Sequence, residues 1–123
     1  MTVQEIKNIL EAEICSREDM LGREVHTACG SDMMSDVLAY VKDQSVLLSG
    51  TVNPQVIRTA EMMDMVCIVF VRGKQPTPEM LELAADKDIC VLSTKYPMFT
   101  ACGKLYEKGL RGGGECEWQS HSS

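Results

Sequence analysis

Three apolar runs of this chain each end in a polar turn that leads into a helical pattern. The runs cover residues 45–48, 65–71 and 89–92. Because a strand, a helix and a further strand in this order bring the chain back in the same direction, the pattern predicts parallel strands. We expect an α/β fold: a small layered sandwich with a mainly parallel sheet of about five strands, flanked by helices.

The segments around these units predict the other elements. A helix over 2–10 would begin with a capping box of Thr2 and Glu5, and 13–16 and 24–29 are predicted strands. Further helices are expected from Ser31 or Asp32 to Val41, after Asn53-Pro54, after Thr77-Pro78 and after Pro97. The last helix has an apolar stripe at helical spacing, made of Phe99, Cys102, Tyr106 and Leu110.

Length and composition predict one domain over residues 1–110 and a disordered tail over 111–123. The net charge of −6 and the lack of any Lys/Arg run argue against nucleic acid and anionic membranes as partners. The apolar run at 65–71 is too short to span a bilayer, and the N-terminus lacks a signal-peptide pattern. We therefore expect a cytoplasmic protein.

The six cysteines show no metal-binding or redox motif, because no C-x-x-C pair and no neighbouring histidine accompany them. Five of them fit small buried hydrophobic residues in a reducing compartment, and only Cys116 in the tail looks exposed. His26 and Cys29 fall on opposite faces of their predicted strand, so they do not form a nucleophilic pair. We predict no catalytic residues, no metal site and no cofactor.

Polar residues of the turns after the strands are the candidate binding residues. In a parallel sheet these turns meet at one edge, where helix N-termini offer N–H donors to an anion or a nucleotide phosphate. The same residue types also cap helices, so capping alone and capping combined with ligand binding both remain open. The candidates are Ser31, Asp32, Ser49, Gly50, Thr51, Asn53, Arg72, Gly73, Ser93 and Thr94.

Several strings in sequential order resemble the DRTGG domain family over about residues 1–110. They are LGREV, SDMMSDVLAY, SGTVNP, VRGKQPTPE and LSTKYPMFTACGKLYEKGL, beginning at positions 21, 31, 49, 71 and 92. Where the family has Thr-Gly-Gly, this chain has Arg72-Gly73-Lys74 and keeps only the first glycine. The resemblance implies a fold similar to the N-terminal domain of HPr kinase/phosphorylase and a non-catalytic, regulatory and often dimeric module.

These observations predict a regulatory or interaction module that forms a homodimer and binds a small anionic metabolite or nucleotide at the carboxyl ends of the strands. Methionines suit adaptable interfaces, so Met33, Met34, Met62 and Met98 are candidate dimer contacts. The alternatives are a pure ligand sensor whose dimerisation is incidental and, less favoured, an enzyme acting on a phosphorylated or acyl compound. The sequence identifies neither the ligand nor any protein partner.

Overall fold

A five-stranded mixed sheet forms the centre of the protein. The computed structural model describes residues 1–32 and 44–111. The strands follow the order β1-β5-β4-β3-β2. Neighbouring strands from β2 to β5 are parallel, and β1 pairs antiparallel with β5. Their bounds are β1 Glu13–Ser16, β2 Thr27–Gly30, β3 Ser45–Ser49, β4 Cys67–Phe70 and β5 Cys90–Ser93. The predicted mainly parallel α/β sheet is confirmed.

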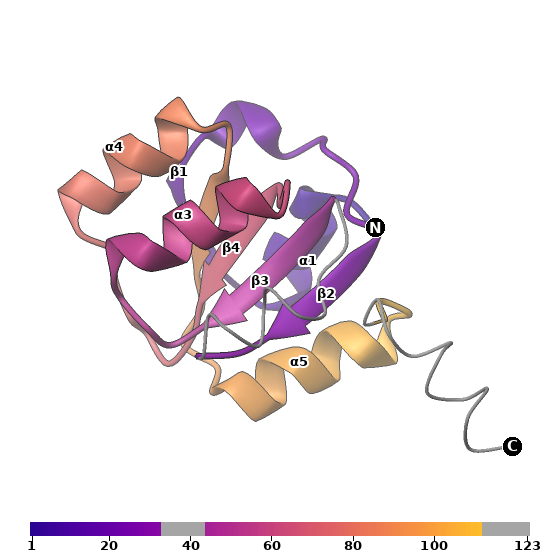
Figure 1. The fold of residues 1–123 in the computed structure, drawn as a ribbon. Helices are drawn as coiled ribbons and strands as arrows, with labels where there is room; N and C mark the ends of the chain where they lie inside the picture. Colours follow the sequence, from indigo (N-terminus) through magenta and orange to yellow (C-terminus); the bar gives the residue numbers. More distant parts are fainter. Residues whose placement is uncertain (33–43, 112–123) are drawn as a thin grey trace, which may run out of the picture.

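Helices cover both faces of this sheet (Figure 1). One face packs against α3 (Pro54–Met62) and α4 (Pro78–Asp86), and the other against α1 (Val3–Ile9) and α5 (Met98–Glu107). The central strands β3, β4 and β5 are buried along their whole length. Each of these strands therefore contributes apolar side chains to two hydrophobic cores, one on each face of the sheet, because successive side chains point to opposite faces.

The predicted helix starts agree with the structure because they depend on local hydrogen bonds. Thr2 and Glu5 form the capping box of α1. Asn53 accepts the Gln55 N–H at 2.7 Å before α3, and Thr77 accepts the Met80 N–H at 3.2 Å before α4. In each case a side-chain oxygen satisfies a donor that the first turn leaves free.

Two sequence expectations are wrong in position. The strand expected at 24–29 begins only at Thr27, where pairing with β3 starts, and His26 lies exposed before it. The predicted apolar stripe of the last helix is correct for Leu110, which is buried, and for Cys102, which packs against the core. It is wrong for Phe99, which is 91% exposed, and for Tyr106, which is 49% exposed, because Ala101 and Leu105 of α5 face the core instead. Packing against β3 and α1 decides which side of α5 faces the core, and helical spacing alone does not contain that information.

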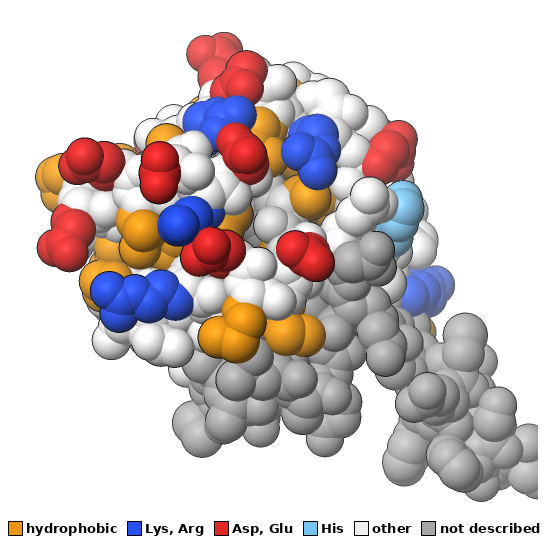
Figure 2. Space-filling view, turned by 45° about the horizontal axis from the view of Figure 1, so that its top comes forward, with side chains coloured by type: hydrophobic (Ala, Val, Ile, Leu, Met, Phe, Trp, Pro, Cys, Tyr) orange, Lys and Arg blue, Asp and Glu red, His pale blue; other side chains and the backbone are white. Residues whose placement is uncertain are grey.

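Other expectations fall outside the described residues. They concern the helix from Met33 to Val41 and the tail from Gly112 to Ser123. In the described part of the chain, no helix is long and apolar enough to cross a membrane. Acidic and basic side chains are interspersed on the face shown in Figure 2, which has no continuous basic stripe.

Candidate functional site

The turn between β3 and α3 brings five of the candidate residues together. Asp32 Oδ1 accepts the Gly50 N–H at 2.6 Å and lies 3.4 Å from Ser49 Oγ. Thr51 donates its hydroxyl to the Asp32 carbonyl at 3.2 Å, and the Ser31 N–H bonds to the Leu48 carbonyl at 3.0 Å. These contacts fix the end of β2 beside the end of β3.

Arg72 adds a cation to this turn from the neighbouring strand end. Its guanidinium Nη2 lies 4.0 Å from Asp32 Oδ2, and its side chain is 55% exposed. A Cβ built on Gly50 would lie 2.7 Å from Arg72 Nη2, too close for a Cβ contact. A side chain at position 50 would therefore push the guanidinium away from its present position over the turn. Arg72, Asp32 and residues 49–51 form what we call the Arg72 site.

Asn53 adjoins the Arg72 site but serves α3. Its Oδ1 is occupied by the Gln55 N–H, as an N-cap requires. By contrast, α5 begins after Pro97 without any side-chain cap. The expected capping role of Asn53 is therefore observed, and a ligand contact of Asn53 stays a prediction.

Ser93 and Thr94 turn inward and do not reach the Arg72 site. Ser93 donates to the Lys74 carbonyl at 2.8 Å, and Thr94 donates to the Leu10 carbonyl at 2.7 Å. Both side chains are buried. Gly73, which has φ +71°, donates its N–H to the Thr94 carbonyl at 2.8 Å. These three candidates hold the β4 and β5 turns together.

A pocket of about 160 Å³ lies beside these turns. Gln75 Nε2 donates to Glu13 Oε1 at 2.7 Å and to Ser93 Oγ at 3.2 Å across it. The Tyr96 hydroxyl donates to Glu11, and this hydrogen bond raises the pKa of Tyr96. Sequence reasoning missed Glu11, Glu13, Gln75 and Tyr96. The antiparallel pairing of β1 with β5 brings the two glutamates to the turns that carry Gln75 and Tyr96, and no local pattern predicts that pairing.

The described thiols are poorly placed to act as nucleophiles. Cys67 and Cys90 are register partners and fully buried, and a hydrogen bond to Cys90 together with burial raises the pKa of Cys67. The hydrogen bond with Cys67 lowers the pKa of Cys90, but that thiol is fully buried. Burial, helped by Glu13, raises the pKa of Cys15 to about 11. Cys15, Cys29 and Cys102 are half-buried rather than buried as expected, because they lie at the margins of the two cores. None of the five described cysteines forms a disulfide.

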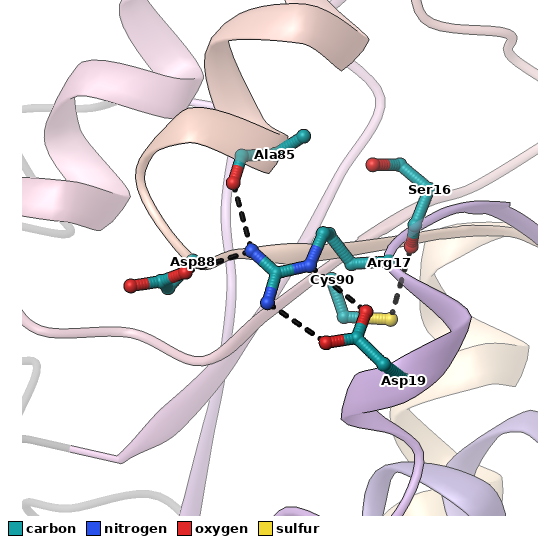
Figure 3. Close-up of polar contacts among 6 residues, drawn as sticks. All are labelled: Ser16, Arg17, Asp19, Ala85, Asp88 and Cys90. Atoms are coloured by element: carbon teal, nitrogen blue, oxygen red, sulfur yellow. Dashed lines mark hydrogen bonds and ion pairs between the residues drawn. The ribbon is translucent and has the colours of Figure 1, made fainter.

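A second polar cluster surrounds Arg17, at the other end of the sheet (Figure 3). The guanidinium contacts Asp19 through two 2.9 Å hydrogen bonds and Asp88 through one of 2.7 Å. It also donates to the Ala85 carbonyl at 2.8 Å, which satisfies the last turn of α4. The arginine is fully engaged in holding β1 against α4, so this cluster is structural.

A pocket of about 420 Å³ lies at that same end. Its charged lining is mixed in sign, and Lys87 is paired with Glu61 at 3.4 Å. Among residues 1–32 and 44–111, no group of three or more His, Cys, Asp or Glu side chains is placed to hold a metal ion. The Arg72 site, with its half-exposed guanidinium, is the candidate site for an anion.

The sequence profile of the DRTGG domain family matches residues 5–107. The chain belongs to the DRTGG domain family. The match covers every helix and strand after the start of α1, including all residues of the Arg72 site. No curated protein matches the chain significantly.

A solved structure with the same fold contains a DRTGG domain. It is the regulatory region of Clostridium perfringens pyrophosphatase, comprising CBS and DRTGG domains, in complex with the activator diadenosine tetraphosphate. The TM-score is 0.71 at 18% sequence identity, over 85% of this chain and 45% of that chain. This chain thus spans less than half of that regulatory region, and the likeness shows the fold.

Proposed function

We propose that this DRTGG domain is a non-catalytic regulatory module that forms a homodimer and binds a small anionic ligand at the Arg72 site. The ligand class is a nucleotide or another phosphorylated metabolite. The occurrence of a DRTGG domain in the regulatory region of a pyrophosphatase that binds a nucleotide activator supports a regulatory role.

The observation that carries the ligand part is the position of Arg72 over Gly50. The guanidinium is exposed and held by a backbone that donates to the Tyr96 carbonyl at 2.9 Å. A planar guanidinium can bind two phosphate oxygens at once, and the first turn of α3 offers further N–H donors close by. The chain as a whole has a net charge of −6, so overall charge does not favour anion binding and the proposal depends on this local positive charge.

Asp32 gives this site an internal competitor. Its carboxylate occupies the Gly50 N–H that a phosphate oxygen would otherwise take, and it lies against Arg72. A ligand must therefore displace the carboxylate or share Arg72 with it. Replacement by asparagine would keep an oxygen acceptor for Gly50 while removing the competing charge.

The hydroxyl groups at this edge support the absence of catalysis in the proposal. Ser93 and Thr94 donate to backbone carbonyls, Thr51 donates to the Asp32 carbonyl, and none of these hydrogen bonds involves His26 or a thiol. An activated nucleophile needs a base within hydrogen-bond reach. These three hydroxyls form no such pair, which counts against the enzyme alternative.

A thermal-shift titration with AMP, ATP, diadenosine tetraphosphate and acetyl phosphate tests the site. A ligand at about 100 times its Kd should raise the free energy of unfolding by about 2.7 kcal/mol, which is a shift of several degrees. We expect Arg72→Gln to abolish the shift and Asp32→Asn to lower the Kd.

Arg23→Gln is the matched control, because Arg23 is an exposed arginine that lines the pocket at the opposite edge. It should leave the shift unchanged. A flat response to all four probes, or an equal shift in Arg72→Gln, would overturn the ligand part. A monomer in sedimentation velocity at micromolar concentration would overturn the homodimer.

A further inference from the structure

Helix α5 displays an aromatic stripe on the side that faces away from the sheet. Ala101 and Leu105 pack into the core, while Phe99 and Gly103 lie on the opposite side. Tyr106 lies at the edge of this side toward β2: the Arg111 guanidinium lies over its ring, 3.8 Å from the centroid, and half of the side chain stays exposed. Phe99 is 91% exposed, the highest value among the large hydrophobic residues described. Within the described chain, nothing requires a phenylalanine there.

Gly103 at the centre of this stripe is equally unexplained by the folded chain. A Cβ added at Gly103 would meet no atom within 4 Å, and its φ is not positive. Neither packing nor backbone conformation requires glycine, which is disfavoured inside helices. A glycine on an exposed helix face allows the backbone of another helix to approach closely.

The stripe matches itself when a second copy is laid on it in the opposite direction. Phe99 lies about 6 Å before Gly103 along the helix and Tyr106 about 4.5 Å after it. A two-fold axis at Gly103 therefore places Phe99 opposite Tyr106 of the second copy, in both directions. Such self-complementarity is what a symmetric dimer interface requires, and aromatic pairs favour contact.

Polar neighbours of the stripe match in the same arrangement. Thr100 and Glu107 are exposed on one flank of α5. The same axis brings the Thr100 hydroxyl opposite the Glu107 carboxylate of the second copy, a donor facing an acceptor. A polar rim around an aromatic centre is typical of protein interfaces.

We propose that α5 is the dimerisation surface: two copies pack antiparallel through Phe99, Gly103 and Tyr106, with Gly103 on the two-fold axis. This inference rests on the proposed homodimer and adds the surface through which the two copies meet. It is independent of ligand binding at the Arg72 site, which lies at the strand ends.

Sedimentation velocity of the full chain tests the surface. We expect a dimer for the wild type and a monomer for Gly103→Arg, because the arginine has room in a single copy but none between two helices. Gly22→Arg is the matched control: Gly22 is also exposed with open space around it, lies away from α5, and should leave the dimer intact. Phe99→Ser, at a side chain that the fold does not need, should also give a monomer.

Cross-linking provides a second readout. Two Gly103→Cys chains should form an intermolecular disulfide when oxidised glutathione accepts the two electrons, since their Cβ atoms would meet at the axis. Gly22→Cys and the wild type should cross-link far less.

Two results would overturn the inference, and only one of them would also overturn the proposed homodimer. A wild-type dimer that survives Gly103→Arg and Phe99→Ser, without cross-linking of Gly103→Cys, would remove this surface but keep the homodimer. A wild-type monomer would remove both.

Discussion

At the scale of single residues, the left-handed backbone positions explain how three helices end. Glu11, Asp64 and Asp88 have φ values of 49°, 54° and 58°, and each directly follows the C-cap of α1, α3 or α4. The Met65 N–H then bonds to the Ala60 carbonyl at 2.9 Å, which closes α3. This conformation is strained for residues other than glycine.

Asp64→Gly should therefore stabilise the protein by about 0.5–1 kcal/mol, because glycine adopts the left-handed conformation without a Cβ penalty. Urea unfolding measures the change in the free energy of unfolding. Asp88→Gly is the informative comparison: it gains the same backbone relief but loses the ion pair with Arg17, so its net gain should be smaller. A destabilised Asp64→Gly variant would contradict the explanation.

Arg17 predicts a pH dependence of stability. Its hydrogen bonds to Asp19 lower the pKa of that carboxyl below 3.8. A lowered folded-state pKa contributes stability that is fully present above the unfolded value, and it is lost as the pH falls through the folded value. Arg17→Gln should therefore lower the melting temperature more at pH 7 than near pH 3.

Asp19→Asn is the control for this measurement, because it removes the titrating group and keeps the Arg17 bond to Ala85. Its loss of stability should vanish at low pH, whereas part of the Arg17→Gln loss should persist. A loss of stability in Arg17→Gln that is independent of pH, together with no loss in Asp19→Asn, would assign the whole effect to the backbone contact with Ala85.

At the scale of elements, helix starts depend on single side chains. Asn53→Ala should reduce the free energy of unfolding by about 1 kcal/mol, because the Gln55 N–H loses its acceptor. Thr77→Ala should cost a similar amount at α4. Denaturant unfolding measures both, and an Asn53→Ala variant that is as stable as the wild type would show that the cap contributes nothing.

The same variant separates two interpretations of the Arg72 site. Since Asn53 is occupied as a cap, Asn53→Ala should leave the response to a nucleotide probe intact once the loss of stability is taken into account. Loss of the response would assign a ligand contact to Asn53, as the sequence alone suggested.

At the scale of the whole molecule, Thr94 joins segments that are distant in sequence. Its hydroxyl donates to the Leu10 carbonyl at 2.7 Å, at a separation of 84 residues, and is fully buried. Thr94→Val keeps the shape but leaves that carbonyl unpaired, which should cost about 1–3 kcal/mol. Urea unfolding measures this cost, and nucleotide binding at the Arg72 site should not change. A stable Thr94→Val variant with lost binding would contradict this assignment.

Much of the fold could be predicted from the sequence because the deciding interactions are local. The cap at Asn53, the proline after it and the apolar run at β4 each act within a few residues, and the structure confirms them. The candidate site was predicted less well. Gly50 and Arg72 meet as expected of neighbouring strand ends, whereas Ser93 and Thr94 point inward to carbonyls that no local pattern identifies.

The sequence by itself determined the order of the elements, the parallel strand–helix units and the caps, since hydrophobic periodicity and turn chemistry are written in neighbouring residues. Only the tertiary structure decided which side of α5 faces the core, that the hydroxyls of Ser93 and Thr94 are buried, and that Arg72 lies over Gly50. These outcomes depend on contacts between residues far apart along the chain and on how the helices pack against the sheet.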